Sequence, residues 1–321
     1  MRAIFIAPGP YMDCVSVVTP TFNRPEPLRR ALASLFRQTN INDFAVEIIV
    51  VDNSLEGNAR VAVAALAAQS PFALHYLSEP RPGVANARHA GVAAARGRWI
   101  AFLDDDEEAD PLWLASLVAV ARDVGADAVF GPIEARAEGG LPIGAFAPFF
   151  ERRITRAPRA DITDLAAFLG TNNSMFDRAA CLAAEVNFDP RLNETGGEDS
   201  LLLQRLVQAG RRFHFAPRAL VYEWAPERRL TWAYVKKRNF LSGQIRVFVQ
   251  DFINPGRRGV IAFWMAVGVA QTLVFGAATL ATAPFGGELS EKMAARLHSG
   301  LGKIFWAPRF RPILYGRGLV S

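Results

Sequence analysis

The stretch Arg-Trp-Ile-Ala-Phe-Leu-Asp-Asp-Asp (residues 98–106) joins an apolar run directly to three carboxylates. The apolar part is typical of a buried strand, and the carboxylates come where such a strand would end in a loop. Mg²⁺ and Mn²⁺ prefer oxygen ligands of this kind, because they bind through one or two carboxylates together with the oxygens of a substrate phosphate. An acidic run is more often a solvated turn, so the metal-site interpretation depends on the rest of the chain.

On both sides of this stretch, apolar runs alternate with helical patterns. Leu28, Ala31, Leu32 and Leu35 follow the i, i+3, i+4, i+7 spacing of a helix that packs on a sheet. Strands separated by helices predict βαβ units and a largely parallel sheet, which is an α/β fold. We expect strands at residues 15–19, 46–51, 74–77, 99–103 and 128–133, and helices at 84–95 and 111–124.

The carboxyl ends of these strands carry the polar residues of interest. In open α/β sheets, ligands bind beyond the carboxyl ends of the strands. Here those ends are followed by residues 20–24, by Asp52 and by the carboxylates of residues 104–106. We therefore expect polar groups from three separated segments to converge on one crevice.

Common nucleotide and metal motifs are missing from the sequence. No Gly-x-Gly-x-x-Gly follows a strand, and there is no Walker-type Gly-Lys-Ser/Thr and no His-Glu-x-x-His. The four histidines also lack the spacing of zinc ligands. These absences argue against dinucleotide redox chemistry, P-loop hydrolysis and zinc hydrolysis.

The composition predicts one large catalytic domain with an appendage, in a reducing compartment. The chain has 321 residues, of which 51% are hydrophobic. Its two cysteines, Cys14 and Cys181, cannot build a disulfide framework. The apolar run within residues 1–10 is interrupted by two prolines and is too short for a secretory signal. We therefore expect the catalytic domain to be cytoplasmic.

The carboxy-terminal part is basic and contains a long uncharged segment. Net charge is +5, and positive residues gather late, at Arg228, Arg229, Lys236, Lys237, Arg238, Arg246, Arg257 and Arg258. Residues 259–287 carry no charge, and 261–284 could cross a hydrocarbon core of about 30 Å as a helix. The basic residues therefore indicate a membrane rather than a nucleic acid. Basic flanks on both sides leave open whether the segment spans the membrane or lies in its surface, and a buried helix or an oligomer contact is the alternative.

Five segments of the chain carry a resemblance to a known family. Val-Ser-Val-Val-Thr-Pro-Thr-Phe-Asn-Arg (15–24), Ile-Ile-Val-Val-Asp-Asn-Ser (48–54), Gly-Val-Ala-Asn-Ala-Arg-His-Ala-Gly (83–91), Phe-Leu-Asp-Asp-Asp (102–106) and Gly-Gly-Glu-Asp (196–199) occur in the order seen in family 2 glycosyltransferases. The likeness covers roughly residues 13–225. The sequence is most similar to the bacterial exopolysaccharide branch of this family, which includes the succinoglycan glucosyltransferases. The resemblance implies a GT-A fold, a nucleotide-sugar donor and inversion at the anomeric carbon.

The resemblance also implies roles for individual residues. Thr21 and Asp52 would face the base and ribose, with Asp52 accepting a hydrogen bond from the pyrimidine ring. Asp104 and Asp106 would form the metal-linked motif, with Asp106 as the direct ligand of Mg²⁺ or Mn²⁺. Asp199 would be the catalytic base. The donor-binding residues would be Pro20, Thr21, Asn23, Asp52, Arg81, Arg88, Asp104 and Asp105.

A base at residue 199 suits the chemistry, because a carboxylate must take the proton of the attacking hydroxyl. Asp199 precedes an apolar helical pattern that ends at Gly210, which places it at a helix start. By itself such a residue is more often a helix N-cap. Glu198 is the fallback base, or a residue that bonds to the acceptor.

Other residues have open roles. Where many relatives have a metal-binding His, this chain offers Glu223, which could ligate the metal or pair with Arg228 or Arg229. Asn172 and Asn173 could meet sugar hydroxyls or form a turn. Tryptophans at 224 and 232 could stack on a sugar, although packing is the more common role. Residues 134–169 should form the variable acceptor side.

The combined prediction is an inverting, metal-dependent glycosyltransferase that moves a hexose from a UDP-sugar to a lipid-linked glycan in bacterial polysaccharide biosynthesis at the inner membrane. We expect residues 13–235 to form the GT-A domain, with a nucleotide-sugar half (13–106) and an acceptor half (107–235). We expect residues 236–321 to form a basic, helical, membrane-associated region. The alternatives are a sugar-phosphate nucleotidyltransferase, and a catalytically silent membrane assembly or binding protein.

Overall fold

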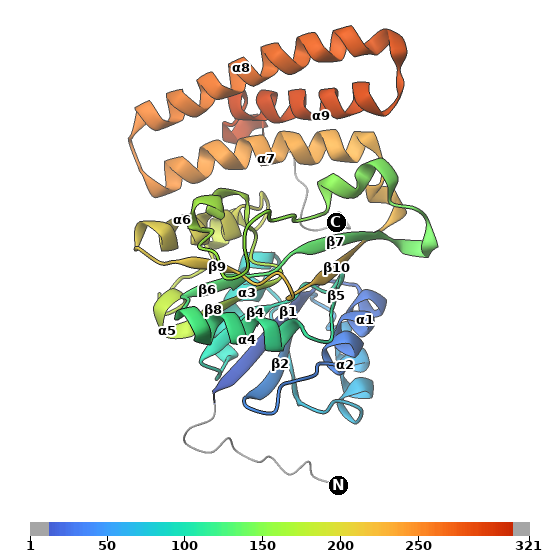
Figure 1. Ribbon diagram of the computed structural model, residues 1–321, viewed down its shortest axis with the longest axis vertical. Helices are drawn as coiled ribbons and strands as arrows, with labels where there is room; N and C mark the ends of the chain where they lie inside the picture. Colours follow the sequence, from blue (N-terminus) through green and yellow to red (C-terminus); the bar gives the residue numbers. More distant parts are fainter. Residues whose placement is uncertain (1–12, 311–321) are drawn as a thin grey trace.

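A seven-stranded mixed sheet forms the centre of the α/β part of the molecule, in the order β3-β2-β1-β4-β8-β6-β9 (Figure 1). The computed structural model describes residues 13–310. The first four strands along the chain are parallel neighbours, and β8 is antiparallel to both β4 and β6. The strands are β1 (Cys14–Thr21), β2 (Ala45–Asp52), β3 (Ala73–Ser78), β4 (Trp99–Phe102), β6 (Ala128–Phe130), β8 (Ser174–Asp177) and β9 (Phe213–Phe215).

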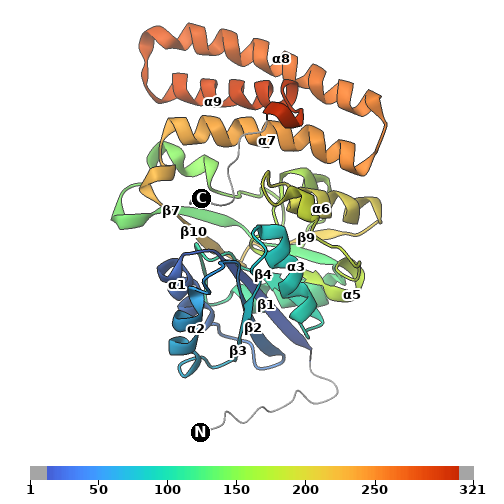
Figure 2. The ribbon, with the colours of Figure 1, turned by 180° about the vertical axis from the view of Figure 1, so that it is seen from behind.

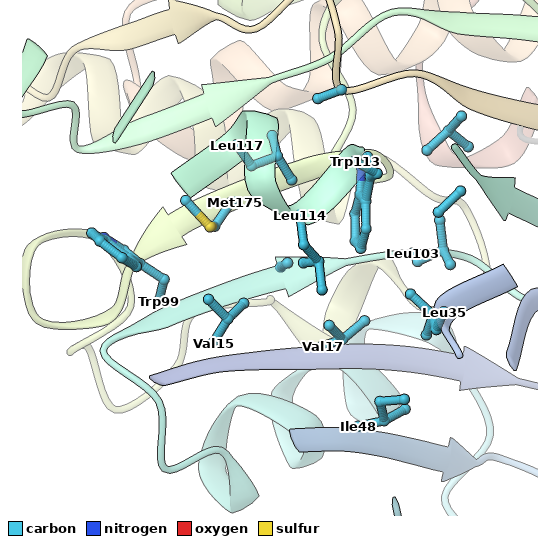
Figure 3. Close-up of a cluster of buried hydrophobic side chains, with 14 of the residues drawn as sticks. Val15, Val17, Leu35, Ile48, Trp99, Leu103, Trp113, Leu114, Leu117 and Met175 are labelled. Carbon is cyan, nitrogen blue, oxygen red and sulfur yellow. The ribbon is translucent and has the colours of Figure 1, made fainter. Parts of the chain in front are cut away.

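Helices cover both faces of this sheet. α1 (Pro25–Leu35), α2 (Ala59–Ala67) and α4 (Trp113–Val124) pack on one face, while α3 (Val84–Ala94) and α6 (Glu198–Gln208) pack on the other. The short helix α5 (Arg178–Cys181) follows β8. Alternate β1 residues point to opposite faces, so Val15 and Val17 join one apolar cluster and Val18 the other. In Figure 3, Leu114 and Leu117 of α4 lie against the sheet. Burial of each such side chain stabilises the folded state by about 1.5–3 kcal/mol relative to leaving it exposed.

A second, three-stranded sheet is formed by segments that leave the main sheet. It contains β5 (Glu107–Ala109), β10 (Val221–Ala225) and β7 (Ile133–Ala137), in that order. The strand expected at residues 128–133 is therefore divided between the two sheets, which corrects the prediction. The division falls at Gly131 and Pro132, because proline has no N–H for a ladder and a Cβ on Gly131 would lie 1.9 Å from the Ala219 carbonyl oxygen.

Three long helices form a separate layer above the α/β part. They are α7 (Trp232–Ile253), α8 (Arg258–Thr282) and α9 (Gly287–Ile304). α9 lies between α7 and α8, so α8 is outermost (Figures 1 and 2). Glycines bring these helices close: a Cβ on Gly302 would lie 2.0 Å from the Phe240 carbonyl oxygen of α7, and one on Gly268 2.9 Å from the Gly300 carbonyl oxygen of α9.

The uncharged segment at 259–287 corresponds closely to α8 and the turn that follows it. Residues 258–285 are long and apolar enough to cross a membrane, by length and composition alone. The expected domain boundary at residue 235 falls inside α7. Residues 1–12 and 311–321, which include the amino-terminal stretch and the end of the predicted membrane-associated region, lie outside the described residues. Short 3₁₀ turns occupy Glu138–Gly140, Gly144–Phe149, Thr163–Phe168, Pro190–Leu192, Glu227–Arg229, Ala283–Phe285 and Pro308–Phe310.

Candidate active site

A cavity of about 640 Å³ opens where the carboxyl ends of β1 and β4 meet the helical layer. Its walls come from the segments after those two strands, from the start of α3, from the start of α6 and from α7. The predicted residues that line it are Pro20, Thr21, Arg88, Asp104, Asp105, Asp106, Glu198 and Asp199. The crevice expected at the carboxyl ends of the strands is therefore present.

Arginines hold all three consecutive carboxylates, with Arg88 bonding to Asp104. Asp105 accepts hydrogen bonds from the Thr21 hydroxyl (Oγ1 to Oδ2, 2.8 Å) and from Arg24 (Nη1 to Oδ1, 3.2 Å). Asp106 Oδ2 accepts from Nη1 of Arg24 at 3.0 Å and from Nη1 of Arg229 at 3.2 Å. Burial raises the pKa of Asp105 to about 7, although the Arg24 guanidinium opposes the shift. The acidic run is thus a charged cluster in a cavity rather than a solvated turn.

Arg88 connects the acidic run to the start of α6. Its guanidinium donates to Asp104 (Nη2 to Oδ1, 3.1 Å) and to Glu198 (Nη1 to Oε1, 2.5 Å), and both Arg88 and Glu198 are buried. Burial raises the pKa of Glu198 to about 7, the neighbouring Asp199 adds to the shift, and Arg88 opposes it. Burial alone would lower the pKa of Arg88, but the three carboxylates around it outweigh this and raise the value. One side chain of α3 therefore joins the acidic run to the start of α6, which lies 110 residues after Arg88 in the chain.

Asp199 lies in the first turn of α6, half-buried and facing the cavity. The N-cap of this helix is Gly197, with φ of 94°, and it makes no side-chain cap. The N-cap role considered for Asp199 is therefore wrong. Its Oδ1 accepts from the backbone N–H of Ser200 at 2.6 Å, and a Cβ on Gly170 would lie 3.1 Å from Oδ2. The absence of a side chain at Gly170 therefore leaves space beside the second oxygen, and both residues line the cavity.

Comparison with known proteins identifies the family. Residues 16–182 match the model described as Glycosyl transferase family 2. This chain belongs to glycosyltransferase family 2. It is therefore a glycosyltransferase whose donor is a nucleotide sugar, and the predicted family is confirmed. This result excludes the two alternatives, a sugar-phosphate nucleotidyltransferase and a catalytically silent membrane protein.

Curated relatives and solved structures agree with this family and fold. The succinoglycan biosynthesis protein ExoM of Rhizobium meliloti (strain 1021) is 33% identical over 224 residues, 70% of this chain and 71% of the relative. ExoO of the same organism is 29% identical over 217 residues, 64% of this chain and 59% of the relative. The mannosyltransferase PcManGT from Pyrobaculum calidifontis, solved with GDP-Man and Mn²⁺, has a TM-score of 0.61 at 18% identity and covers 92% and 88% of the two chains. Staphylococcus aureus TarS residues 1–349 with UDP has a TM-score of 0.54 at 14% identity and covers 95% and 98%. The predicted GT-A fold is confirmed.

Three predicted donor-binding residues of this glycosyltransferase do not line the cavity. Asp52 is fully buried; its Oδ1 accepts from N–H and hydroxyl of Ser54, and its Oδ2 accepts from the Ala59 N–H and the Tyr76 hydroxyl. Asn23 is exposed, and Arg81 extends into solvent, where it pairs with Glu79. Nearby residues thus hold Asp52 and Arg81, and Asn23 Oδ1 accepts from Asn58 Nδ2 at 2.7 Å. The donor-binding role of all three stays a prediction.

Asn53 lines the cavity next to the buried Asp52. Its Nδ2 donates to the carbonyl oxygens of Glu79 and Arg81, each at 2.7 Å, and its Oδ1 accepts from the Gly83 N–H at 2.7 Å. Asn53 thus braces the loop that leads into α3, where Arg88 is located. The sequence signal for it was present, because Asn53 directly follows Asp52 in the same motif.

The other residues with open roles divide between the cavity and the core. Glu223 lines the cavity, and burial raises its pKa to about 7 against the influence of Arg238 and Arg229. Asn172 also lines the cavity and donates to Glu107 (Nδ2 to Oε1, 2.9 Å). Asn173 is buried and bonds to backbone carbonyls and to Trp113.

Neither of the two tryptophans with open roles lines this cavity. Trp232 packs on Phe146 and Phe149, with ring centroids 4.9 and 5.8 Å apart, and the Trp224 ring lies beneath Arg30 and Arg136. Packing, the more common role of tryptophan, is thus the one observed for Trp232.

The sequence did not identify three arginines as residues of the site. Arg229 belonged to the basic cluster assigned to the membrane, yet it is buried and bonds to Asp106. Arg152 is half-buried and donates to carbonyl oxygens of Gly131, Gly170, Asn172 and Asn173. Arg24 is part of the quoted motif at 15–24 but was given no role. A lone arginine has no periodicity, so only its tertiary partners identify it.

Proposed function

We propose that this glycosyltransferase transfers a hexose, with inversion, from a UDP-sugar to a lipid-linked saccharide in bacterial polysaccharide biosynthesis. The observation that carries the proposal is that Asp199 and the carboxylates of residues 104–106 line one cavity, where Arg88 joins Asp104 to Glu198, the residue before Asp199. The similarity to ExoM and ExoO, which are named for succinoglycan biosynthesis, supports a polysaccharide product. TarS structures with UDP and UDP-GlcNAc support a UDP-sugar donor.

Asp104 and Asp106 would hold Mg²⁺ or Mn²⁺. Among residues 13–310 no group of three or more His, Cys, Asp and Glu side chains is placed to hold a metal. Two carboxylates still fit these cations, because Mg²⁺ is commonly bound by one or two carboxylates and completes its shell with water and substrate phosphates. When bound, the cation would offset the charge that develops on the departing diphosphate. A related fold, PcManGT, was solved with GDP-Man and Mn²⁺, and Arg24 and Arg229 add positive charge beside Asp106.

Asp199 would act as the base in a single displacement. The acceptor oxygen attacks the anomeric carbon, the bond from that carbon to the diphosphate oxygen breaks, and the hydroxyl proton passes to Asp199. Attack opposite the leaving group inverts the anomeric configuration. Glu198 is less suited to this role, because Arg88 occupies its Oε1 and its side chain is only 5% exposed. We assign Glu198 to positioning Arg88 and the start of α6.

We further propose that the catalytic domain comprises residues 13–235, with donor and acceptor halves at 13–106 and 107–235, and that residues 236–321 attach it to the cytoplasmic face of the inner membrane. α8 presents an outward row of exposed apolar side chains, including Phe263 (61% exposed), Leu273 (68%) and Leu280 (77%). The inner face of α8 lies along α9, and the helix does not project away from the molecule (Figure 2). Exposed Arg257 and Arg258 stand at its start. This arrangement favours a helix lying in the membrane surface over one that spans it.

A panel of radiolabelled nucleotide sugars tests the proposed activity. Membranes containing the protein should transfer label from one UDP-sugar into a lipid-extractable saccharide, and membranes from the same host without the protein should not. Release of labelled free sugar without a labelled lipid or glycan, across the whole panel, would contradict the proposed acceptor. Analysis of the anomeric configuration of the product by NMR then tests inversion.

A further inference from the structure

Arg246 differs from the other arginines of the cavity. It lies in α7, half-buried, with its guanidinium carbon 4.6 Å from the ring centroid of Phe168 and 5.6 Å from that of Trp264. Burial lowers the pKa of Arg246, and no neighbouring carboxylate opposes the shift. The other arginines that line the cavity bond to protein oxygens; they are Arg24, Arg88, Arg152, Arg229 and Arg238. Within residues 13–310, Arg246 has aromatic rings as its partners but no carboxylate.

A second cation lies where α9 packs on α7 beside Arg246, because a Cβ on Gly243, three residues before Arg246, would lie 3.1 Å from the Lys303 backbone nitrogen. Lys303 of α9 is buried, and its Nζ donates to Gln271 Oε1 at 2.8 Å and to Ser299 Oγ at 3.1 Å. Burial, with a smaller contribution from Arg246, lowers the pKa of Lys303 to about 8. Two partly desolvated positive charges without an acid are unfavourable. An anion from outside the chain would relieve this cost.

The position of Arg246 indicates which anion this would be. Ile245, the preceding residue, packs on Gly197 at the start of α6, and Phe168 is two residues before Gly170, which borders Asp199. Arg246 is therefore on the side of the cavity where the base is located. Its other aromatic partner, Trp264, belongs to α8, the helix with the apolar outer face. The guanidinium thus lies between the expected acceptor position and the expected membrane surface.

We propose that Arg246, supported by the charge of Lys303, binds the phosphate of the lipid-linked acceptor. A guanidinium can bind phosphate oxygens in a bidentate manner. The lipid would continue towards α8 and the saccharide towards Asp199. This inference rests on the proposed function, and it adds the site at which the acceptor carrier is recognised.

A binding experiment tests this site without requiring turnover. The purified full-length protein in detergent is titrated with geranylgeranyl diphosphate and with geranylgeraniol, and affinity is measured by microscale thermophoresis. We expect Arg246→Gln to weaken binding of the diphosphate at least about ten-fold, or about 1.4 kcal/mol, because the amide cannot make the charge-assisted hydrogen bonds of a guanidinium. Binding of the alcohol should not change. Arg246→Lys should retain part of the diphosphate affinity, and Arg258→Gln, an exposed arginine of the same helical layer, should retain all of it.

Several results would overturn the site. One is equal diphosphate affinity in the wild-type protein and Arg246→Gln when both melt at the same temperature. Another is an equal loss of UDP affinity in this variant, which would assign Arg246 to the donor. A third is weaker binding to phosphatidylglycerol vesicles with unchanged diphosphate affinity, which would assign it to the bulk membrane. If no nucleotide sugar supports transfer but Arg246→Gln still loses the diphosphate selectively, the site stands and the proposed activity fails.

Discussion

Around the cavity of the α/β part, arginines pair with the carboxylates of residues 104–106 and 198. In the helical layer, by contrast, two cations have no carboxylate partner among residues 13–310. In the first region, Arg88 joins Asp104 to Glu198, and Asp106 is held by Arg24 and Arg229. In the second, Arg246 and Lys303 face aromatic rings and neutral polar groups. A paired network is arranged before substrate arrives, while unpaired cations gain their partner only on binding. The two regions therefore suit different tasks, which are catalysis and recognition of the acceptor carrier.

The largest effect should come from the base in the α/β part. We expect Asp199→Asn to lower kcat by about 10²- to 10⁴-fold, the usual contribution of a positioned general base, because the amide cannot take the hydroxyl proton. Donor affinity, measured by titration with the UDP-sugar, should not change. Asp251→Asn, an exposed acid on α7, is the matched control. Near-normal turnover by Asp199→Asn would show that another group takes the proton.

Removal of divalent cations should come next. With EDTA we expect transfer to fall by about 10²-fold or more, because the charge of the departing diphosphate loses several kcal/mol of stabilisation. Mn²⁺ or Mg²⁺ in excess should restore the rate. Binding of geranylgeranyl diphosphate at Arg246 should be insensitive to EDTA, which separates the two regions. Undiminished transfer in EDTA would remove the cation from the proposed chemistry.

The paired network should also be sensitive to loss of its central cation. Arg88→Met leaves the buried Glu198 and the half-buried Asp104 without a cationic partner, and breaking a buried pair in this way costs about 3–5 kcal/mol of unfolding free energy. Urea denaturation measures the loss. Arg81→Met removes an arginine whose side chain is 69% exposed and whose partner is Glu79, so it should hardly change the midpoint. Equal midpoints for the two variants would contradict the structural role of Arg88.

The smallest effect should be a pH dependence in the helical layer. The pKa of Lys303 is lowered from 10.5 to about 8 in the folded protein, so the unfolded chain binds the extra proton between these values. The free energy of unfolding should therefore rise as pH increases from about 8 to 10.5. Lys303→Met should remove this rise, as measured by melting temperature across the pH range. Lys292→Met, a partly exposed lysine on α9, should leave it in place.

Much of the α/β part could be predicted because its signals are local. Residues 15–19, 46–51 and 74–77 all lie in strands of the main sheet, as do residues 99–102 of the expected strand at 99–103. Leu28, Ala31, Leu32 and Leu35 lie on the buried face of α1. Residues after β1 and β4 do meet in one cavity, since strand ends of a parallel sheet share an edge. Asp52 did not follow the expectation, because its carboxylate is occupied by the turn that starts α2.

The role of α7 could not be predicted in the same way. Leu241, Ile245 and Val249 show helical spacing, but periodicity does not say what an apolar helix face covers. In the structure this face closes the cavity over the start of α6. Arg229 and Arg246, which belong to one basic cluster in the sequence, consequently face the cavity, while Arg257 and Arg258 remain exposed.

By itself, the sequence determined the order of strands and helices, the acidic run at a strand end, the family and the uncharged helix, because each depends on residues close together in the chain. The tertiary structure decided which charges are paired. Arg88 reaches Glu198 across 110 residues and Arg229 reaches Asp106 across 123. Among residues 13–310, Arg246 contacts aromatic rings and has no carboxylate partner. Such ion pairs depend on burial and on contacts between distant segments, and the local spacing of residues predicts neither.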